Sequence, residues 1–557
     1  MKAIYKTLLA AVAVTPLLTG CIEEAIDSSV ITSGDLQGNA GATTALVWGM
    51  PARLNLVTLD PDIHCDMGYT GVLHVRDVMT GDMPVEYAGG FDWFGWASAV
   101  TNTGSDWAMQ QITWNYYYEQ INTTNNVMRA IDPETDNELL RYNLATGLTY
   151  RAFLYLDLAR MYEVLPNELF PDCKSDAGQD IKGLTVPIVT DKTTEDDSRN
   201  NPRATHKEMY EFILGDLVEA EELFSGNTTA RPSKTIPDLA VLYGLKARLY
   251  LWDASYQAEI NEDDAAAATQ YAEAAKYARQ AITTSGATPL TQADWQSTTQ
   301  GFNDSSMSSW MFAGEYTAED AVVQAGGIRT FSSFCCNEQN FGYAAPSQGA
   351  FTMIDAQMYS RMSDRDWRKL SYFAPENSAL RGREPFLNKD FAEENFYAYV
   401  SLKFRPGSGE MDNYNVGAVV AYPLMRVEEM YFIEAEATAH TNPSAGNELL
   451  TSFMKTYRYA TYSNTLAAAE AVVEEIIFQK RVELWGEGQT FFDIKRLNYS
   501  VERFYNGTNW DTSRNTFNTN GRPAWMNFAI SNQEARNNAA LTAFNTPSCD
   551  GLYTPNK

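Results

Sequence analysis

Apolar residues recur at the spacing of an amphipathic helix along two long parts of this chain. In the clearest case Leu148, Ala152, Tyr155, Ala159 and Tyr162 follow one another at alternating intervals of four and three residues. This spacing gathers the side chains on one face of a helix, so we expect a helix that buries this face. The same pattern predicts further helices over residues 107–128, 209–224, 242–252 and 271–281.

Small residues on these predicted helices indicate close contacts between neighbouring helices. Gly244 and Ala247 lie on one predicted helix, and Ala274 and Ala278 lie on the next. Consecutive amphipathic helices with small contact residues are similar to the helix pairs of tetratricopeptide repeats. The pattern therefore predicts a mainly α fold, built on a tetratricopeptide-like helical scaffold of the α-solenoid type.

The helical pattern stops between about residues 290 and 420, where Gly, Ser, Asn and aromatic residues replace it. A short apolar burst at residues 310–312 predicts one of a few strands in a region that otherwise consists of loops. Helices are expected again over residues 424–438 and 466–486. We expect this irregular region to pack on the helices that flank it in the sequence.

The length and composition describe a large globular protein. The chain has 557 residues, of which 45% are hydrophobic and 20% are charged. Length alone would allow about two to four domains. We expect a single domain over residues 40–557, with a helical scaffold at about 105–290 and 420–498 and a loop-rich, strand-poor region at about 60–104 and 290–420.

The net charge of −29 arises from 71 acidic residues against 42 basic ones. An acidic surface repels phosphate groups, so we expect no nucleic acid partner. The simplest interpretation of the acidity itself is solubility.

The first residues have the pattern of an export signal. Lys2 and Lys6 precede an apolar run over residues 8–18, which is too short to span a bilayer as a helix. The run ends in Leu-Thr-Gly followed by Cys21, a sequence that resembles the lipobox of bacterial lipoproteins. The resemblance implies a signal peptide over residues 1–20 and acylation of Cys21. The polar residues 21–39 would then form a flexible tether, whereas the alternative is an ordinary secretory signal with a chance cysteine.

The other cysteines and the histidines show no catalytic or metal-binding pattern. The other five cysteines are odd in number and irregularly spaced, so their disulfide pairing stays open (Cys65, Cys173, Cys335, Cys336 and Cys549). The four histidines lack ligand spacing, and no nucleotide-binding, zinc-protease or serine-hydrolase motif is present. We therefore expect no metal, no cofactor and no enzymatic activity, although carboxylates far apart in the chain leave a glycosidase pair open.

A stretch near the C-terminus carries a specific motif. Residues 476–488 read IIFQKRVELWGEG, and residues 492–496 read FDIKR. This pattern resembles the signature of the SusD/RagB family. The residues that match the signature are Arg481, Glu483, Leu484, Glu487, Gly488, Asp493 and Arg496. Shorter family elements are matched by residues 366–368, 403–405 and 423–437. Because charged residues within an apolar helix need partners, we interpret the motif as stabilising the fold.

The resemblance implies a surface lipoprotein of the outer membrane in Bacteroidetes that faces the cell exterior and captures an oligomeric nutrient. It implies an oligosaccharide or polysaccharide ligand and a SusC-like TonB-dependent transporter as the partner, with this protein acting as its lid. Capture of oligopeptides, which some family members are thought to perform, is the first alternative. A surface glycoside hydrolase is the second.

A glycan site needs flat aromatic rings beside a few polar groups, because sugar rings present apolar C–H faces edged by hydroxyls. The best candidate is a glycine-containing segment that we expect to be a loop, with Asp92, Trp93, Phe94 and Trp96. The family draws further contacts from insertions like the irregular middle region, where the candidates are Tyr316, Arg329, Phe331, Phe334, Asn337, Phe341 and Tyr343. We expect four other tryptophans to lie in the core, namely Trp107, Trp114, Trp310 and Trp485.

Overall fold

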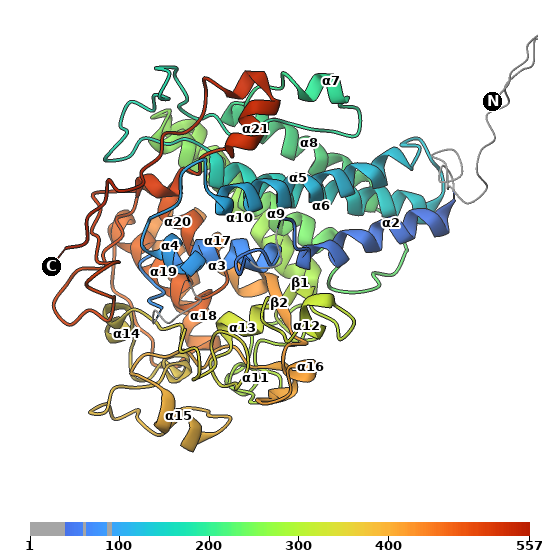
Figure 1. The fold of residues 1–557 in the computed structure, drawn as a ribbon. Helices are drawn as coiled ribbons and strands as arrows, with labels where there is room; N and C mark the ends of the chain where they lie inside the picture. The colour runs from blue at the N-terminus through green and yellow to red at the C-terminus, as the bar shows by residue number, and fades with distance from the viewer. Residues whose placement is uncertain (1–38, 60–62, 86–91, 557) are drawn as a thin grey trace, which may run out of the picture.

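The computed structural model describes residues 39–59, 63–85 and 92–556, and these residues form the fold shown in Figure 1. The predicted signal peptide, the acylation site Cys21 and nearly all of the predicted tether lie outside the described residues. The side chains of Asp92 and Trp93 also lie outside them. Among the described residues no helix is both long and apolar enough to cross a membrane.

Helices dominate the structure, which confirms the prediction of a mainly α fold. The long helices are α2 (Ala40–Ala52), α5 (Ala108–Arg129), α6 (Glu138–Tyr162), α8 (His206–Phe224), α9 (Leu239–Glu259), α10 (Asp264–Ser285), α17 (Val427–Thr441), α18 (Pro443–Tyr457) and α19 (Ala469–Glu483). The shorter ones outside the middle region are α3 (Tyr69–Val78), α4 (Asp92–Ser98), α7 (Glu195–Ser198), α11 (Gln292–Trp295), α20 (Thr490–Arg496) and α21 (Asn532–Asn537).

The long helices stack in sequence order. Helix α5 packs on α6, α6 on α8, α8 on α9, and α9 on α10. The stack continues from α10 to α17, although more than a hundred residues separate these two helices in the chain. This serial packing of neighbours is consistent with the tetratricopeptide-like scaffold that the apolar spacing predicts.

Helix α8 shows how the local sequence sets one of these elements. The Thr205 hydroxyl accepts a hydrogen bond from the backbone N–H of Glu208 at 3.3 Å, and the Glu208 carboxylate accepts one from the backbone N–H of Thr205 at 2.8 Å. This reciprocal capping box satisfies two donors that would otherwise lack partners at the helix start. Further along, Met209, Ile213 and Leu217 are completely buried, so the apolar face predicted from the sequence lies in the core.

The irregular middle region leaves the scaffold and returns to it at a two-stranded antiparallel ribbon. Strand β1 (Trp310–Glu315) pairs with β2 (Ala421–Arg426), and Glu315 lies opposite Ala421. The ribbon confirms the strand predicted at residues 310–312, whereas the helix expected from residue 424 begins only at Val427. Residues 316–420 between the strands hold only short helices: α12 (Ala321–Gln324), α13 (Phe331–Cys335), α14 (Ala356–Arg361), α15 (Lys389–Asn395) and α16 (Tyr414–Gly417). This segment lies below the long helices in the view of Figure 1.

Close packing at Gly244 joins the scaffold to the ribbon. A Cβ atom built on Gly244 would lie 2.3 Å from the sulfur of Met425 in β2 and 3.3 Å from that of Met430 in α17. A side chain at this position would therefore force Met425 and Met430 to shift where α9 meets the elements that follow the middle region. The small residue is needed for contact with β2 and α17.

The family-type motif forms part of a buried cluster of ion pairs, which we call the charged cluster. It contains four cations and four anions, all nearly inaccessible to solvent: Arg368, Lys403, Arg426 and Arg458 with Asp366, Glu428, Glu483 and Glu487. Arg481 instead reaches Asp82, and Asp493 pairs with Lys480 and Arg496. The cluster thus ties α19 to the ribbon and to the middle region.

The five described cysteines are all buried and none forms a disulfide. Within the described ranges no group of three or more His, Cys, Asp or Glu side chains is arranged to hold a metal ion.

Candidate functional site

Two tryptophans meet at the surface where α4 leads into α5. The Trp96 side chain is half-buried, and Trp107 is 43% exposed. Their ring centroids lie 6.3 Å apart with the ring planes at 51°. The prediction that Trp107 belongs to the core is wrong, because this residue precedes the first turn of α5. The predicted loop is also wrong, since residues 92–98 form helix α4.

The turn between the two tryptophans is tightly held. The Asp550 carboxylate accepts hydrogen bonds from the backbone N–H of Thr103 at 2.8 Å, from its hydroxyl at 2.6 Å and from the backbone N–H of Gly104 at 3.0 Å. Gly104 in turn accepts a hydrogen bond from the backbone N–H of Trp107 at 3.1 Å. The C-terminal segment thus fixes the start of α5, so little conformational freedom remains to be lost when a ligand binds.

Behind this surface, residues from the two predicted regions form one aromatic cluster. Phe94 contacts Phe334 edge-on with centroids 4.6 Å apart, and Phe334 stacks on Tyr343 at 5.0 Å. His74 lies 4.6 Å from Phe94, and the Tyr343 hydroxyl is 2.5 Å from Nε2 of His64. The structure therefore brings together side chains that are more than two hundred residues apart in the sequence.

Burial keeps His74 and Tyr343 of this cluster uncharged near pH 7. Burial lowers the pKa of His74 to about 3, so its imidazole carries no charge. Burial also raises the pKa of Tyr343 to about 12, although the nearby Arg329 acts in the opposite direction. Phe94 and Phe334 are fully buried and have no free ring face. These two rings are therefore part of the core and offer no platform for a ligand.

The other predicted contact residues of the middle region are also mostly internal. Asn337 is buried and donates hydrogen bonds to the backbone carbonyls of Thr352 at 3.1 Å and Ser401 at 2.8 Å. Phe331 packs edge-on against Phe404 with centroids 5.0 Å apart. Phe341 is buried as well, whereas Arg329 is half-buried. Asn337 and Phe331 therefore hold the middle region together and have no free surface for a ligand.

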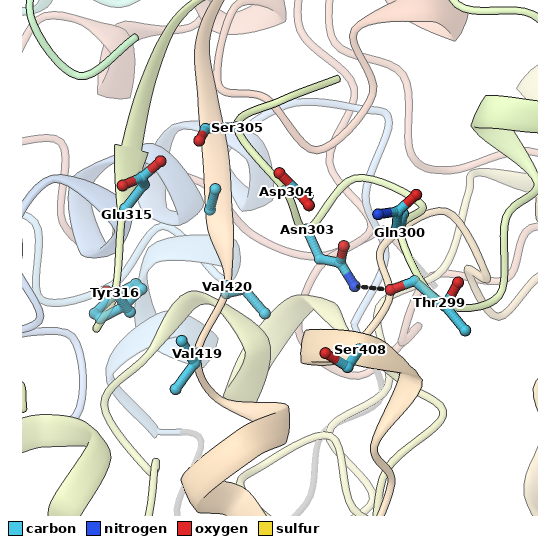
Figure 2. A pocket seen from close by; sticks show the side chains of 11 residues that line it. Thr299, Gln300, Asn303, Asp304, Ser305, Glu315, Tyr316, Ser408, Val419 and Val420 are labelled. Carbon is cyan, nitrogen blue, oxygen red and sulfur yellow. Dashed lines mark hydrogen bonds between the residues drawn. The ribbon is translucent and has the colours of Figure 1, made fainter. Parts of the chain in front are cut away.

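Tyr316 lines a polar pocket at the end of the ribbon, and Figure 2 shows this pocket. The cavity has a volume of about 530 Å³ and is lined by Thr299, Gln300, Asn303, Asp304, Ser305, Glu315, Tyr316, Ser408, Val419, Val420 and Ala421. Hydroxyl, amide and carboxylate groups surround it, and none of the described lining residues is a tryptophan. Such a lining can exchange hydrogen bonds with hydroxyl groups but offers little flat apolar surface.

Hydrogen bonds fix the shape of this pocket. The Asn303 amide donates to the backbone carbonyls of Thr299 at 3.0 Å and Pro406 at 2.7 Å, the first of which is drawn in Figure 2. On the other side, the Tyr316 hydroxyl is 2.7 Å from that of Thr70. Sequence reasoning missed this pocket, apart from Tyr316, because the pairing of β1 with β2 and the hydrogen bonds of Asn303 bring together segments that are remote in the sequence.

Comparison with known proteins identifies the family. Residues 71–251 match a family model described as starch-binding and associating with the outer membrane, and residues 387–546 match the model of the SusD family. The chain belongs to the SusD/RagB family. The first match runs from α3 into α9, and the second begins inside the middle region and continues through the ribbon and the helices that follow it. No curated protein matches the chain.

Solved structures of SusD-type proteins share the fold. A SusD-like carbohydrate-binding protein from Bacteroides vulgatus superposes with a TM-score of 0.69 at 22% identity, covering 92% of this chain and 99% of that one. A SusD superfamily protein from Bacteroides thetaiotaomicron gives 0.64 at 17% identity, with 91% and 99% covered. One from Bacteroides fragilis gives 0.62 at 17% identity, also with 91% and 99% covered.

Proposed function

We propose that this SusD/RagB protein is a non-enzymatic binding protein that captures a glycan at the outer surface of the outer membrane. The membership of the family and its description as starch-binding and outer-membrane-associated support this function. The observation that carries it to a site is the tryptophan pair, in which Trp107 is exposed and Trp96, on α4, is half-buried, on either side of the turn that Asp550 holds.

The geometry of the pair suits a sugar. Tryptophan offers the largest flat face among the side chains and has few rotatable bonds to order on binding. Trp107 is exposed beside a second ring that is half-buried, and apolar rings grouped at a surface point to a ligand. The angle of 51° between the rings lets them contact two successive rings of a bent oligosaccharide.

Delivery to a SusC-like TonB-dependent transporter completes the proposal. With acylation at Cys21, residues 21–39 would connect the lipid to α2. At about 3.5 Å per extended residue, this tether reaches roughly 60 Å. That length would let the domain move as a lid while it stays attached to the membrane. Capture by aromatic and hydrogen-bonding contacts requires no cofactor.

The test is isothermal titration calorimetry against plant, host and microbial glycans, with peptides as controls. We expect Trp107→Ala and Trp96→Ala to weaken glycan binding at least about fivefold, the equivalent of a lost aromatic contact of about 1 kcal/mol. Trp48→Ala is the matched control, because Trp48 is 42% exposed on α2 and belongs neither to the tryptophan pair nor to the pocket at the ribbon. Unchanged affinity in both site variants would show that the ligand binds elsewhere.

The same measurements separate the alternatives. Binding of peptides in preference to glycans would replace the glycan proposal with oligopeptide capture. Steady hydrolysis of a polysaccharide, abolished by Glu315→Gln or Asp304→Asn in the pocket of Figure 2, would establish a glycoside hydrolase.

A further inference from the structure

A second cavity lies on α5, about 10 Å along the helix axis from Trp107. Its volume is about 390 Å³, and it is enclosed by α5, the segment over residues 187–201 and α21. The side chains that matter for its chemistry are Trp114, Tyr118, Glu119, Asn201, Glu534 and Asn538. None of them belongs to the tryptophan pair or to the pocket at the ribbon.

The wall of this cavity is rigid. The Tyr118 hydroxyl donates a hydrogen bond to the backbone carbonyl of Pro187 at 2.7 Å. Asn538 accepts from the backbone N–H of Asn201 at 3.0 Å and donates to its carbonyl at 2.7 Å. The Asn201 amide donates to the carbonyl of Ile188 at 2.8 Å. These bonds hold three separate parts of the chain around the cavity.

One side of the cavity is aromatic. Trp114 and Tyr118 lie one helical turn apart on α5, with ring centroids 4.6 Å apart and planes tilted by 34°. Trp114 is nearly buried, whereas Tyr118 is half-buried and lines the space. An aromatic face carries partial negative charge, which attracts a cation placed over the ring.

The charged groups of the cavity are acidic. Glu534 is half-buried and forms no ion pair with any Lys, Arg or His of the described residues. Burial raises its pKa, and a hydrogen bond from the Trp114 side chain partly opposes this effect. Burial likewise raises the pKa of Glu119, while Arg53 opposes it. No described residue that lines the cavity is basic.

A carboxylate held in a partly desolvated position without a cation is costly, and a cationic ligand would relieve that cost. We propose that this cavity binds a primary ammonium group, with Glu534 as its counter-ion and the Tyr118 ring beneath it. The ammonium group can come from an amino sugar or from a lysine side chain. In the first case the inference extends the proposed glycan binding to the recognition of a cationic sugar unit.

Two pairs of ligands test this proposal by calorimetry at about pH 6, where an amine is protonated. Glucosamine is compared with glucose, and Nα-acetyl-lysine amide with Nα-acetyl-norleucine amide. We expect the protonated member of at least one pair to bind at least about tenfold more tightly than its neutral counterpart. The pair that shows the difference identifies the source of the ammonium group.

Variants then locate the binding. Glu534→Gln preserves size and should weaken ammonium binding about tenfold, and Tyr118→Leu should weaken it severalfold. Glu315→Gln is the matched control, since Glu315 is also a half-buried carboxylate at a pocket. The comparison of each charged ligand with its neutral counterpart does not depend on the tryptophan pair, so a failure of the glycan proposal would not affect this result. Equal binding of charged and neutral ligands, or unaltered affinity in Glu534→Gln, would overturn the inference.

Discussion

Replacing Glu483 by glutamine should strongly destabilise this protein. Glu483 lies at the end of α19 inside the charged cluster and is inaccessible to solvent. One carboxylate oxygen accepts hydrogen bonds from Arg368 at 2.9 Å and from Arg458 at 2.7 Å. The other accepts from Arg458 at 2.6 Å and from Arg426 at 3.3 Å. Each oxygen therefore serves two guanidinium donors.

The magnitude follows from charge balance and from these contacts. The charged cluster contains four cations and four anions, so the substitution leaves one buried positive charge without compensation. Whichever way the glutamine amide turns, its NH₂ group faces two donors. Breaking a buried ion pair by removing one partner typically costs about 3–5 kcal/mol. We expect a loss of at least about 3 kcal/mol of unfolding free energy.

The assay is equilibrium unfolding in urea, with Glu195→Gln as the control. Glu195 pairs with Arg199 at the surface, where both side chains are mostly exposed. A surface pair of this kind contributes about 0–1 kcal/mol. If Glu483→Gln costs no more than the control, the charged cluster does not stabilise the fold as argued. Folded Glu483→Gln protein should still bind glycan normally, because the described side-chain partners of Glu483 are the arginines of the charged cluster and not the tryptophan pair.

The effect should depend on pH in a defined direction. Burial raises the pKa of Glu483, but Arg458, Arg368 and Arg426 outweigh it and hold the pKa well below the ordinary value of 4.5. A carboxyl group with a depressed pKa contributes stability above its unfolded pKa, and this contribution is lost as the pH falls towards the folded value. The difference between wild type and variant should therefore be constant near neutrality and shrink below about pH 4.

Three further predictions concern other parts of the molecule. Burial disfavours the charged form of His206, but Glu163 and Asp253 outweigh this effect and raise the pKa of His206. Its contribution to stability should therefore be complete below about pH 6.5 and be lost as the pH rises through the raised pKa. In urea unfolding, the unfolding free energy of His206→Gln should depend less on pH than that of the wild type. Gly244→Ala should lower the unfolding free energy by about 1–3 kcal/mol through its clash with Met425, measured by urea unfolding against Gly215→Ala, which has no neighbour within 4 Å. Asp550→Asn should weaken glycan binding without contacting the ligand, because the turn that presents Trp107 loosens; calorimetric affinity equal to wild type would contradict this.

The helical scaffold and the family could both be predicted from the sequence. The apolar stripe from Leu148 to Tyr162 lies inside α6, as its period of 3.6 residues requires. The strand at residues 310–312 was also predictable from a short apolar run. Periodicity reveals the helices, the short apolar run reveals the strand, and the motif at residues 476–488 and 492–496 reveals the family, because each is a feature of neighbouring residues along the chain.

The arrangement of the candidate site could not be predicted from the sequence, because it depends on tertiary contacts. Trp107 is a large apolar residue at the start of a predicted helix, so the sequence predicts that it is buried. It lies before the first turn of α5, in a turn that Asp550 holds, and this position places it at the surface beside Trp96. Phe94 and Phe334 meet in one aromatic cluster only after the middle region folds back on the scaffold. Exposure and contact between distant residues are properties of packing, and packing depends on side chains that are remote in the sequence.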